Sequence, residues 1–191
     1  MQTLYLPSSG PQHTETVLER SLQYAQEAEI ATIILASTTG ATARKMLEYL
    51  DRYPDLNLIV VTHHWGFRTQ DSWEFDVNIA AEIRQRPNCQ MLTTAHALSG
   101  VERSFRLEFK TMLPIEMIAL TLRRTFGDGT KVAMEMALMV ADSGLVDTKT
   151  DIVCIAGTGR GADTAWRLRP STSNRLFDLR MKEIIAKPAE F

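Results

Sequence analysis

The decisive stretch of this sequence is Ile33-Ile34-Leu35-Ala36-Ser37-Thr38-Thr39-Gly40-Ala41-Thr42-Ala43, an apolar run that ends in hydroxyl side chains around one glycine. Residues 33–35 are typical of a buried strand, and residues 44–50 continue with the apolar spacing of a helix. The stretch therefore predicts a strand, a turn and a helix in succession.

The turn of this unit is a candidate anion site. The first backbone N–H groups of a helix have no partner within the helix and lie at the positive end of its dipole. Hydroxyl and backbone donors at the turn can therefore surround a phosphate group, and they come from Ser37, Thr38, Thr39, Gly40 and Thr42. From these residues alone, an ordinary turn with a threonine cap is slightly favoured, because hydroxyl caps are common at helix starts.

Composition and charge favour a single globular domain and argue against nucleic-acid and membrane partners. The 191 residues, 45% of them hydrophobic, suit one globular domain over residues 1–191. The formal net charge of -2, without a basic run, argues against a nucleic-acid partner. We expect a cytoplasmic protein without a membrane partner, because we find neither a charged leader with an apolar run nor a segment long enough to span a bilayer. Cys89 and Cys154 lie in predicted buried strands, where cysteine usually acts as a small hydrophobe.

Strands alternate with helices along the rest of the chain. Residues 58–62, 90–94 and 151–156 are predicted to be further strands of a parallel sheet, because the segments between them have helical spacing. Residues 4–6 and 183–187 are predicted edge strands, and residues 164–169 alternate like a strand. The fold class is therefore α/β, a three-layer sandwich whose mostly parallel sheet has an antiparallel edge.

The predicted helices cover residues 14–29, capped by Thr14, and residues 76–86, 101–109, 114–126 and 131–143. The last helix is apolar almost all round, which indicates burial in the core or at a subunit contact. Its apolar girdle favours a homo-oligomer, and the girdle consists of Met134, Met136, Leu138, Met139 and Val140. A solvated face is predicted for Glu135 rather than a buried catalytic carboxylate, because it shares a stripe with Asp128, Lys131 and Asp142.

A second glycine-rich loop, Gly157-Thr158-Gly159-Arg160-Gly161-Ala162-Asp163, follows the strand at residues 151–156. It lacks the spacing of a dinucleotide fingerprint and leads into a strand instead of a helix, which excludes a Rossmann dinucleotide site. Arg160 offers a planar donor for phosphate or carboxylate, and Asp163 offers an acceptor. A glycine-rich hairpin without a ligand is the alternative.

The loops that follow the parallel strands meet at one edge of the sheet, where ligands of α/β proteins bind. His63, His64 and His96 offer nitrogens for acid–base catalysis, and only one of the two adjacent histidines is expected to face the ligand. Trp65 and Phe67 offer apolar surface. We expect no metal site, because no helical pair or cysteine pair arranges these histidines.

Two separated motifs resemble the C-terminal α/β domain of pyruvate kinase. The hydroxyl turn corresponds to a Thr-Lys-Ser-Gly-Arg-Ser-Ala-like loop that in this family holds a phosphate of the sugar-bisphosphate activator. Ser37, Thr39, Gly40 and Thr42 match by position, and Thr38 stands in place of the basic residue. The second match is the strand at residues 151–156 with its Gly-Thr-Gly-Arg-Gly loop. The resemblance favours the phosphate site over the ordinary turn.

The stretches Val-Thr-His-His, Thr-Ala-His-Ala-Leu-Ser-Gly and Gly-Thr-Gly-Arg-Gly-Ala-Asp-Thr-Ala make the chain similar to stand-alone proteins described as pyruvate kinase α/β-domain-like. Members of that family lack the catalytic barrel and have been associated with flavin mononucleotide (FMN). The resemblance therefore implies a domain that binds a phosphorylated small molecule, with FMN as the cofactor, and argues against pyruvate kinase activity.

An enzyme that acts on a sugar phosphate or uses a flavin, with His63, His64 or His96 in acid–base roles, is the alternative function. A flavin fits better than a bisphosphorylated sugar, since the latter needs cations at both ends and the sequence offers an obvious one only at Arg160. The residues expected to bind the cofactor are Ser37, Thr38, Thr39, Gly40, Thr42, His64, Trp65, Thr94, His96, Gly157, Thr158, Gly159, Arg160, Gly161, Ala162 and Asp163.

Overall fold

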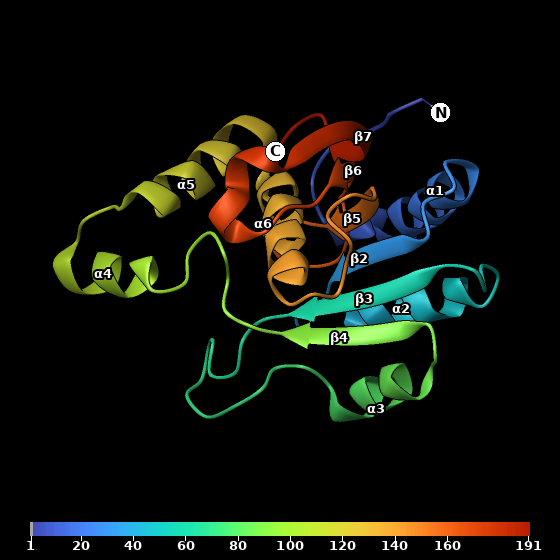
Figure 1. Ribbon diagram of the computed structural model, residues 1–191, viewed down its shortest axis with the longest axis horizontal. Helices are drawn as coiled ribbons and strands as arrows, with labels where there is room; N and C mark the ends of the chain where they lie inside the picture. The colour runs from blue at the N-terminus through green and yellow to red at the C-terminus, as the bar shows by residue number, and fades with distance from the viewer. Residues whose placement is uncertain (1) are drawn as a thin grey trace.

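Within residues 2–191, which a computed structural model of the chain describes, seven strands form one sheet that helices cover on both faces (Figure 1). The elements are β1 (Leu4–Leu6), η1 (Pro11–His13), α1 (Thr14–Glu27), β2 (Thr32–Ala36), α2 (Ala41–Leu50), β3 (Asn57–Thr62), α3 (Val77–Gln85), β4 (Cys89–Thr93), α4 (Glu102–Phe109), α5 (Pro114–Phe126), α6 (Asp128–Asp142), β5 (Ile152–Ala156), β6 (Thr164–Arg169), η2 (Ser173–Asp178) and β7 (Arg180–Pro188).

The strand order is β1-β7-β6-β5-β2-β3-β4. All neighbouring strands pair in parallel except β6, which runs antiparallel to both β5 and β7. This confirms the mostly parallel sheet with an antiparallel portion on one side. The prediction of β7 as an edge strand is wrong, because the short β1 pairs with its outer side and is itself the edge.

Side chains of the central strands alternate between two hydrophobic cores. Ile33 and Leu35 of β2 pack in the core that contains α1, α2 and α3, whereas Ile34 packs in the core that contains α5 and α6. Both faces of the sheet are therefore covered, which confirms the three layers and explains why the central strands are uniformly apolar. Cys89 and Cys154 are both free and buried, as expected.

The chain changes direction across the sheet at β2. From β2 it proceeds outward through α2 to β3 and through α3 to β4, and it then returns through α4, α5 and α6 to β5, on the other side of β2. Because β2 and β5 are parallel neighbours, their carboxyl ends lie at the same edge of the sheet, where ligands of α/β proteins bind. The fold thus places the turn after β2 next to the loop after β5.

Thr14 does not cap α1, which corrects the sequence prediction. The residue at the N-cap position is His13, and the Thr14 hydroxyl donates to the Pro11 carbonyl at 2.7 Å. The same hydroxyl accepts the backbone N–H of Ala162 at 3.0 Å. Thr14 therefore ties the start of α1 to the glycine-rich loop, a partner 148 residues away that no local pattern indicates.

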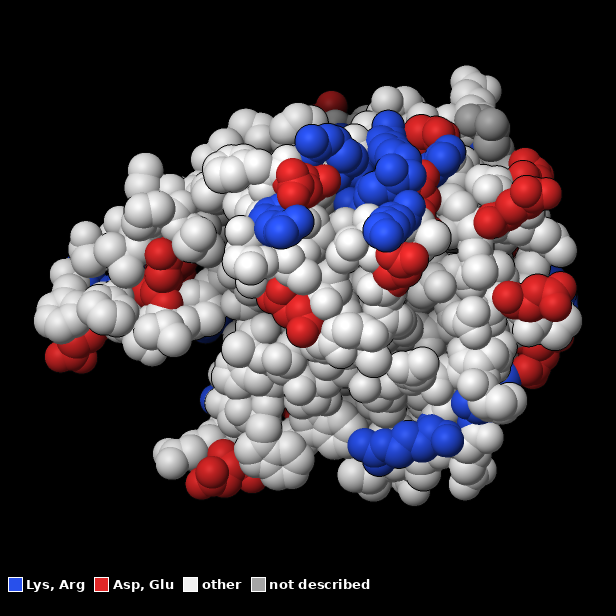
Figure 2. All heavy atoms as spheres, in the orientation of Figure 1, with Lys and Arg blue, Asp and Glu red and all other residues white. Residues whose placement is uncertain are grey.

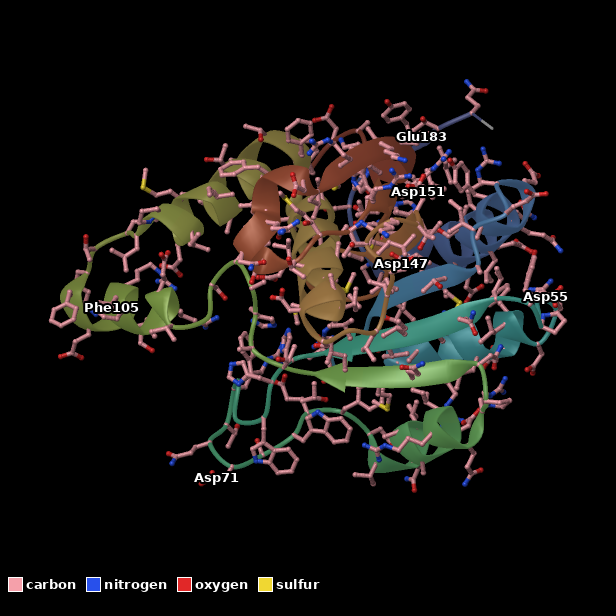
Figure 3. All side chains as sticks on the ribbon, in the orientation of Figure 1. Asp55, Asp71, Phe105, Asp147, Asp151 and Glu183 are labelled. Carbon is pink, nitrogen blue, oxygen red and sulfur yellow. The ribbon has the colours of Figure 1, made fainter. Side chains whose placement is uncertain are left out.

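Lys and Arg side chains gather over β6 and β7 in the space-filling view (Figure 2), close to where Asp151 and Glu183 are labelled among the side chains (Figure 3). The Asp151 carboxylate pairs with Arg167, Arg169 and Lys182. This ionic cluster fastens the start of β5 to β6 and β7, at the edge of the sheet opposite the carboxyl ends of the parallel strands. No helix within residues 2–191 combines the length and the apolar character needed to cross a membrane.

The apolar girdle of α6 is buried inside the chain, against the sheet and α5. Met136, Leu138, Met139 and Val140 belong to the core, and Met134 is partly buried against it. A group of exposed apolar side chains lies instead on α4, α5 and the segment between them, and it includes Phe105, Leu107, Phe109, Met112 and Met117. In Figure 1, α4 projects from the body of the molecule.

Self-association therefore stays a prediction, and its basis moves from α6 to the exposed apolar side chains of α4 and α5. We expect light scattering at micromolar concentration to return at least twice the mass of one chain. Phe109→Ser, which removes a side chain that is 67% exposed, should shift this mass towards that of the monomer. A monomer mass for the unaltered chain would contradict the prediction.

Candidate functional site

A cleft of about 830 Å³ lies at the carboxyl edge of the sheet, where β2 and β5 are neighbours. The turn after β2, the segment after β3 and the loop after β5 line it, together with α4, α5 and α6. Figure 2 shows the molecule hollowed between two projections, which the labels of Phe105 on α4 and Asp71 after β3 mark in Figure 3. Its volume is in the range of small-molecule sites.

The turn after β2 directs unpaired donors into this cleft. In the first turn of α2, the Ala43 N–H donates to Ser37 Oγ at 3.3 Å, and the Arg44 N–H donates to the Gly40 carbonyl at 2.8 Å. The N–H groups of Ala41 and Thr42 come before the first intrahelical bond, so the helix offers them no acceptor. Both residues line the cleft.

Thr42 lies at the centre of the predicted anion site. The residue is only 8% exposed and lines the cleft, and its hydroxyl makes no hydrogen bond within the described part of the chain. The hydroxyl is therefore open to the cleft and can donate to a ligand there. Thr38 and Thr39 line the cleft beside it. The hydroxyls of Thr38, Thr39 and Thr42 with the N–H groups of Ala41 and Thr42 are called the phosphate seat below.

Gly40 does not line the cleft, although it is the N-cap residue of α2. Its φ of 97° lies in the left-handed region, which favours glycine. A Cβ atom there would come within 2.8 Å of Ile79 Cδ1 on α3. Packing against α3 and the backbone conformation require the glycine, so a substitution at this position would test the fold before it tested ligand binding.

The glycine-rich loop divides into a buried anchor and an exposed tip. Asp163 is fully buried, and its carboxylate accepts the N–H groups of Gly10 and Thr158, each at 3.0 Å, and the Thr164 hydroxyl at 2.7 Å. Its acceptors therefore hold the loop and are not directed at the cleft. At the tip, Arg160 lines the cleft and is exposed.

The remaining residues of this loop follow the same division. Gly157, Gly159 and Gly161 line the cleft, whereas Thr158 and Ala162 do not. Ala162 is buried, and its N–H is bonded to Thr14. A Cβ atom on Gly161 would come within 2.7 Å of Pro11 Cα, so this glycine permits the close approach of the loop to the start of α1.

Of the histidines in the predicted site, the structure brings His63 and His96 into the cleft and leaves His64 outside its lining. Trp65 and Thr94 are also outside. Trp65 is 60% exposed and stacks on Trp73 at 6.4 Å between ring centroids. The aromatic surface of the cleft is instead Phe67, whose ring lies 4.0 Å from that of His63 and 5.0 Å from that of His96.

Glu74 holds His63 in place. The Nδ1 atom of His63 is 2.9 Å from Glu74 Oε2, and the Nε atom of Arg68 donates to Glu74 Oε1, also at 2.9 Å. No sequence pattern pointed to Glu74, because it lies in an irregular segment 11 residues from His63. The carboxylate joins the two ends of this segment below the cleft.

A buried ion pair lies in the wall that α6 contributes, which corrects the predicted solvated face. Lys131 and Glu135 are each 4% exposed, and Lys131 Nζ is 2.5 Å from Glu135 Oε2. Glu135 Oε1 accepts the N–H of Leu98 at 2.9 Å. Burial lowers the pKa of Lys131, although Glu135 opposes this shift. Of the predicted stripe, Asp142 is exposed and Asp128 is partly buried.

Burial also lowers the pKa of His96 from 6.5 to about 4, with a smaller opposing effect of Glu135. The His96 ring is therefore neutral at physiological pH. Its two nitrogens make no hydrogen bond to any of the described residues, and the residue lines the cleft. A neutral imidazole has one N–H donor and one acceptor, and both remain available to a ligand.

The cleft contains more cations than the sequence indicated, because α4 and α5 contribute Arg103, Arg106 and Arg123. Arg106 donates to both oxygens of Glu116 at 2.9 and 3.0 Å, and Arg123 pairs with Asp128. Arg103 lies over the Phe67 ring, 4.9 Å from its centroid. Within residues 2–191, neither Arg103 nor Arg160 has a carboxylate partner.

Comparisons with known proteins find similarity to pyruvate kinases. The family model described as the pyruvate kinase alpha/beta domain matches residues 15–166. A structure of Cryptosporidium parvum pyruvate kinase in complex with ADP is similar at 13% identity, with a TM-score of 0.40, over 81% of this chain and 22% of that chain. Another pyruvate kinase structure from Cryptosporidium parvum matches at 12% identity, with a TM-score of 0.42, over 83% of this chain and 23% of that chain. This chain therefore spans less than a quarter of those chains.

The buried ion pair predicts a large effect of removing one partner. In Glu135→Ala, Lys131 would remain buried without a counter-charge, and the Leu98 N–H would lose its acceptor. We expect the free energy of unfolding in urea to fall by about 3–5 kcal/mol. The control is Glu82→Ala, which removes the partly exposed pairs of Glu82 with Arg86, at the same spacing, and with Arg44, and it should cost less than about 1 kcal/mol. Equal losses in the two variants would contradict the buried pairing.

His96 predicts a pH dependence with a definite sign. Between pH 6.5 and about 4 the unfolded chain binds a proton at His96 that the folded chain does not, so stability should fall as the pH is lowered through this window. Nuclear magnetic resonance should give a midpoint near pH 4 for the His96 ring protons. His96→Phe should lose less stability across the window. A midpoint near the ordinary value would contradict the burial of this ring.

Proposed function

Because the chain belongs to the pyruvate kinase α/β domain family, we propose that its cleft binds a phosphorylated small molecule with the phosphate group in the phosphate seat. The observation that carries this proposal is the Thr42 hydroxyl, which belongs to a residue only 8% exposed, lines the cleft and has no hydrogen-bond partner among the described residues. Two free N–H groups at the start of α2 and the positive end of its dipole favour an anion at the same point.

Flavin mononucleotide is the cofactor that we propose to test first. The phosphate seat fits its terminal phosphate, and the rings of Phe67, His63 and His96 offer surfaces for a flat ring system. Arg160 and the backbone of Gly159 at the loop tip offer donors for polar ring atoms. A bound flavin would supply reversible electron and hydride transfer. In this proposal Phe67, and not Trp65 as the sequence suggested, provides the apolar surface for the flavin ring.

A sugar phosphate is the second candidate ligand, and the free arginines of the cleft favour it. The sequence offered an obvious cation only at Arg160, which spoke against a ligand with anionic groups at both ends. Arg103 adds a guanidinium group without a carboxylate partner among residues 2–191. A sugar with two phosphates can thus reach the phosphate seat and one of these arginines.

Titration calorimetry with FMN and riboflavin tests the phosphate seat. We expect FMN to bind more tightly by about 2–4 kcal/mol, since hydrogen bonds to a charged group contribute more than neutral ones. Thr42→Val keeps the shape of the side chain and removes the hydroxyl, and it should weaken FMN binding but not riboflavin binding. The matched control is Thr125→Val, whose hydroxyl bonds to its own helix on α5.

Equal affinities for FMN and riboflavin, or an unchanged FMN affinity in Thr42→Val, would contradict the phosphate seat. Tight binding of fructose bisphosphate without FMN binding would instead select the sugar phosphate. Crystals soaked in phosphate provide a second measurement, because an anion should then lie between Thr38 and Thr42.

A further inference from the structure

Two histidines of the cleft lining and one carboxylate behind them have a geometry that binding of a phosphate does not require. His63 and His96 lie on the lining with their ring centroids 5.1 Å apart and their planes nearly perpendicular. The carboxylate of Glu74 lies behind His63, 2.9 Å from Nδ1. A histidine oriented by a carboxylate and directed at a ligand cleft is the arrangement that general acid–base catalysis uses.

Glu74 fixes the form in which His63 faces the cleft. A carboxylate accepts but does not donate, so Nδ1 of a neutral His63 carries the proton and donates it to Glu74. Nε2 then has a free lone pair, and no described residue donates to it. Arg68 bonds to the other carboxylate oxygen and keeps Glu74 in place. His63 is therefore held as a proton acceptor.

His96 complements His63 as a donor. Its ring is neutral at physiological pH because burial lowers its pKa to about 4. A neutral imidazole N–H can donate to an oxygen that gains negative charge, and it does so without first carrying a positive charge. The neighbouring Lys131 and Glu135 neutralise each other within their ion pair. One imidazole is thus suited to take a proton from the ligand and the other to bind an oxygen.

The sheet fixes where these imidazoles lie relative to the phosphate seat. Ala36 of β2 is in register with Val61 of β3, so His63 follows its strand at nearly the same level as Thr38 follows β2. Neighbouring strands are about 4.8 Å apart. A short ligand with its phosphate in the seat can therefore extend its carbon chain to His63.

We propose that the cleft catalyses proton transfer on a small phosphorylated hydroxyaldehyde or hydroxyketone, with His63 as the base and His96 as the hydrogen-bond donor to the carbonyl oxygen. The inference rests on the phosphate seat of the proposed function and does not require a flavin. Glu74 is a positioning residue, because it acts through His63.

The reaction is balanced without a further reactant. His63 Nε2 takes the proton from the hydroxyl-bearing carbon next to the carbonyl, the electrons of that C–H bond form a C=C bond, and the carbonyl oxygen takes up the charge next to His96. The hydroxyl proton then passes to that oxygen, and the proton on His63 returns to the former carbonyl carbon. The product is the isomeric carbonyl compound, and nothing is oxidised or reduced overall.

Proton exchange with solvent tests this reaction directly, with dihydroxyacetone phosphate as the probe. In D₂O the protein should replace one carbon-bound hydrogen next to the carbonyl with deuterium, which removes its signal from the proton spectrum. His63→Gln should slow this exchange at least about 100-fold, the usual contribution of a general base. The matched control is His13→Gln, because His13 lies on η1 outside the cleft lining, and it should exchange at the unaltered rate.

The positioning role of Glu74 has its own readout. In Glu74→Gln the nitrogen-15 shifts of the His63 ring should show a mixture of tautomers, and exchange should fall about 10-fold, with partial recovery in Glu74→Asp. A purely structural role would leave the tautomer unchanged. Inorganic phosphate and FMN should each slow the exchange by competition for the phosphate seat.

Two results would overturn the inference. One is equal exchange in His63→Gln and the unaltered protein prepared in the same way, which would also expose a contaminating enzyme. The other is no exchange by a protein that binds phosphate, which would leave the proposed function intact. Failure to bind phosphate at all, in contrast, would refute the proposed function itself.

Discussion

The parallel pairing of β2 with β5 on one side and with β3 on the other is the constraint on which the site depends. The carboxyl ends of these three parallel strands therefore lie at one edge of the sheet, where ligands of α/β proteins bind. The phosphate seat after β2 lies beside both the loop tip with Arg160 and His63 after β3. Each segment is short, so the register of the strands, more than the flexibility of the loops, determines which groups meet.

The polar groups near this edge have two distinct tasks. The hydrogen bonds of Asp163 and Thr14 hold the glycine-rich loop against the start of α1. Lys131 and Glu135 satisfy each other and the backbone of Leu98 beneath the cleft. These paired groups stabilise the walls of the cleft. A buried charge without a partner would lower the stability of the fold far more than a buried charge that is paired. The groups left without partners, such as the Thr42 hydroxyl and the nitrogens of His96, are therefore the ones that can bind a ligand.

Secondary structure elements that depend on neighbouring residues along the chain could be predicted from the sequence. Site residues that depend on tertiary contacts could not. The strand and helix after Ile33 and the switch to a strand after Asp163 were predicted from local periodicity, and both are confirmed. Glu74 reaches His63 only through an irregular segment, and Arg103 reaches the cleft only through a long crossover, and no spacing in the sequence describes either contact. Glu135 was misjudged although a signal existed: a Lys–Glu pair four residues apart in an otherwise apolar helix indicates a buried pair as well as a solvated stripe.

The phosphate seat contains no residue with a full positive charge, since Thr38 and its neighbours offer only hydroxyl and backbone donors. A phosphate in the seat would be held by hydroxyls, backbone N–H groups and the helix dipole, none of which carries a full charge. The positive charges lie elsewhere, at Arg103 over Phe67 and at Arg160 on the loop tip. They are therefore not consumed by the phosphate and can act on another part of the ligand, so the ligand would be oriented from both ends with the imidazoles of His63 and His96 between.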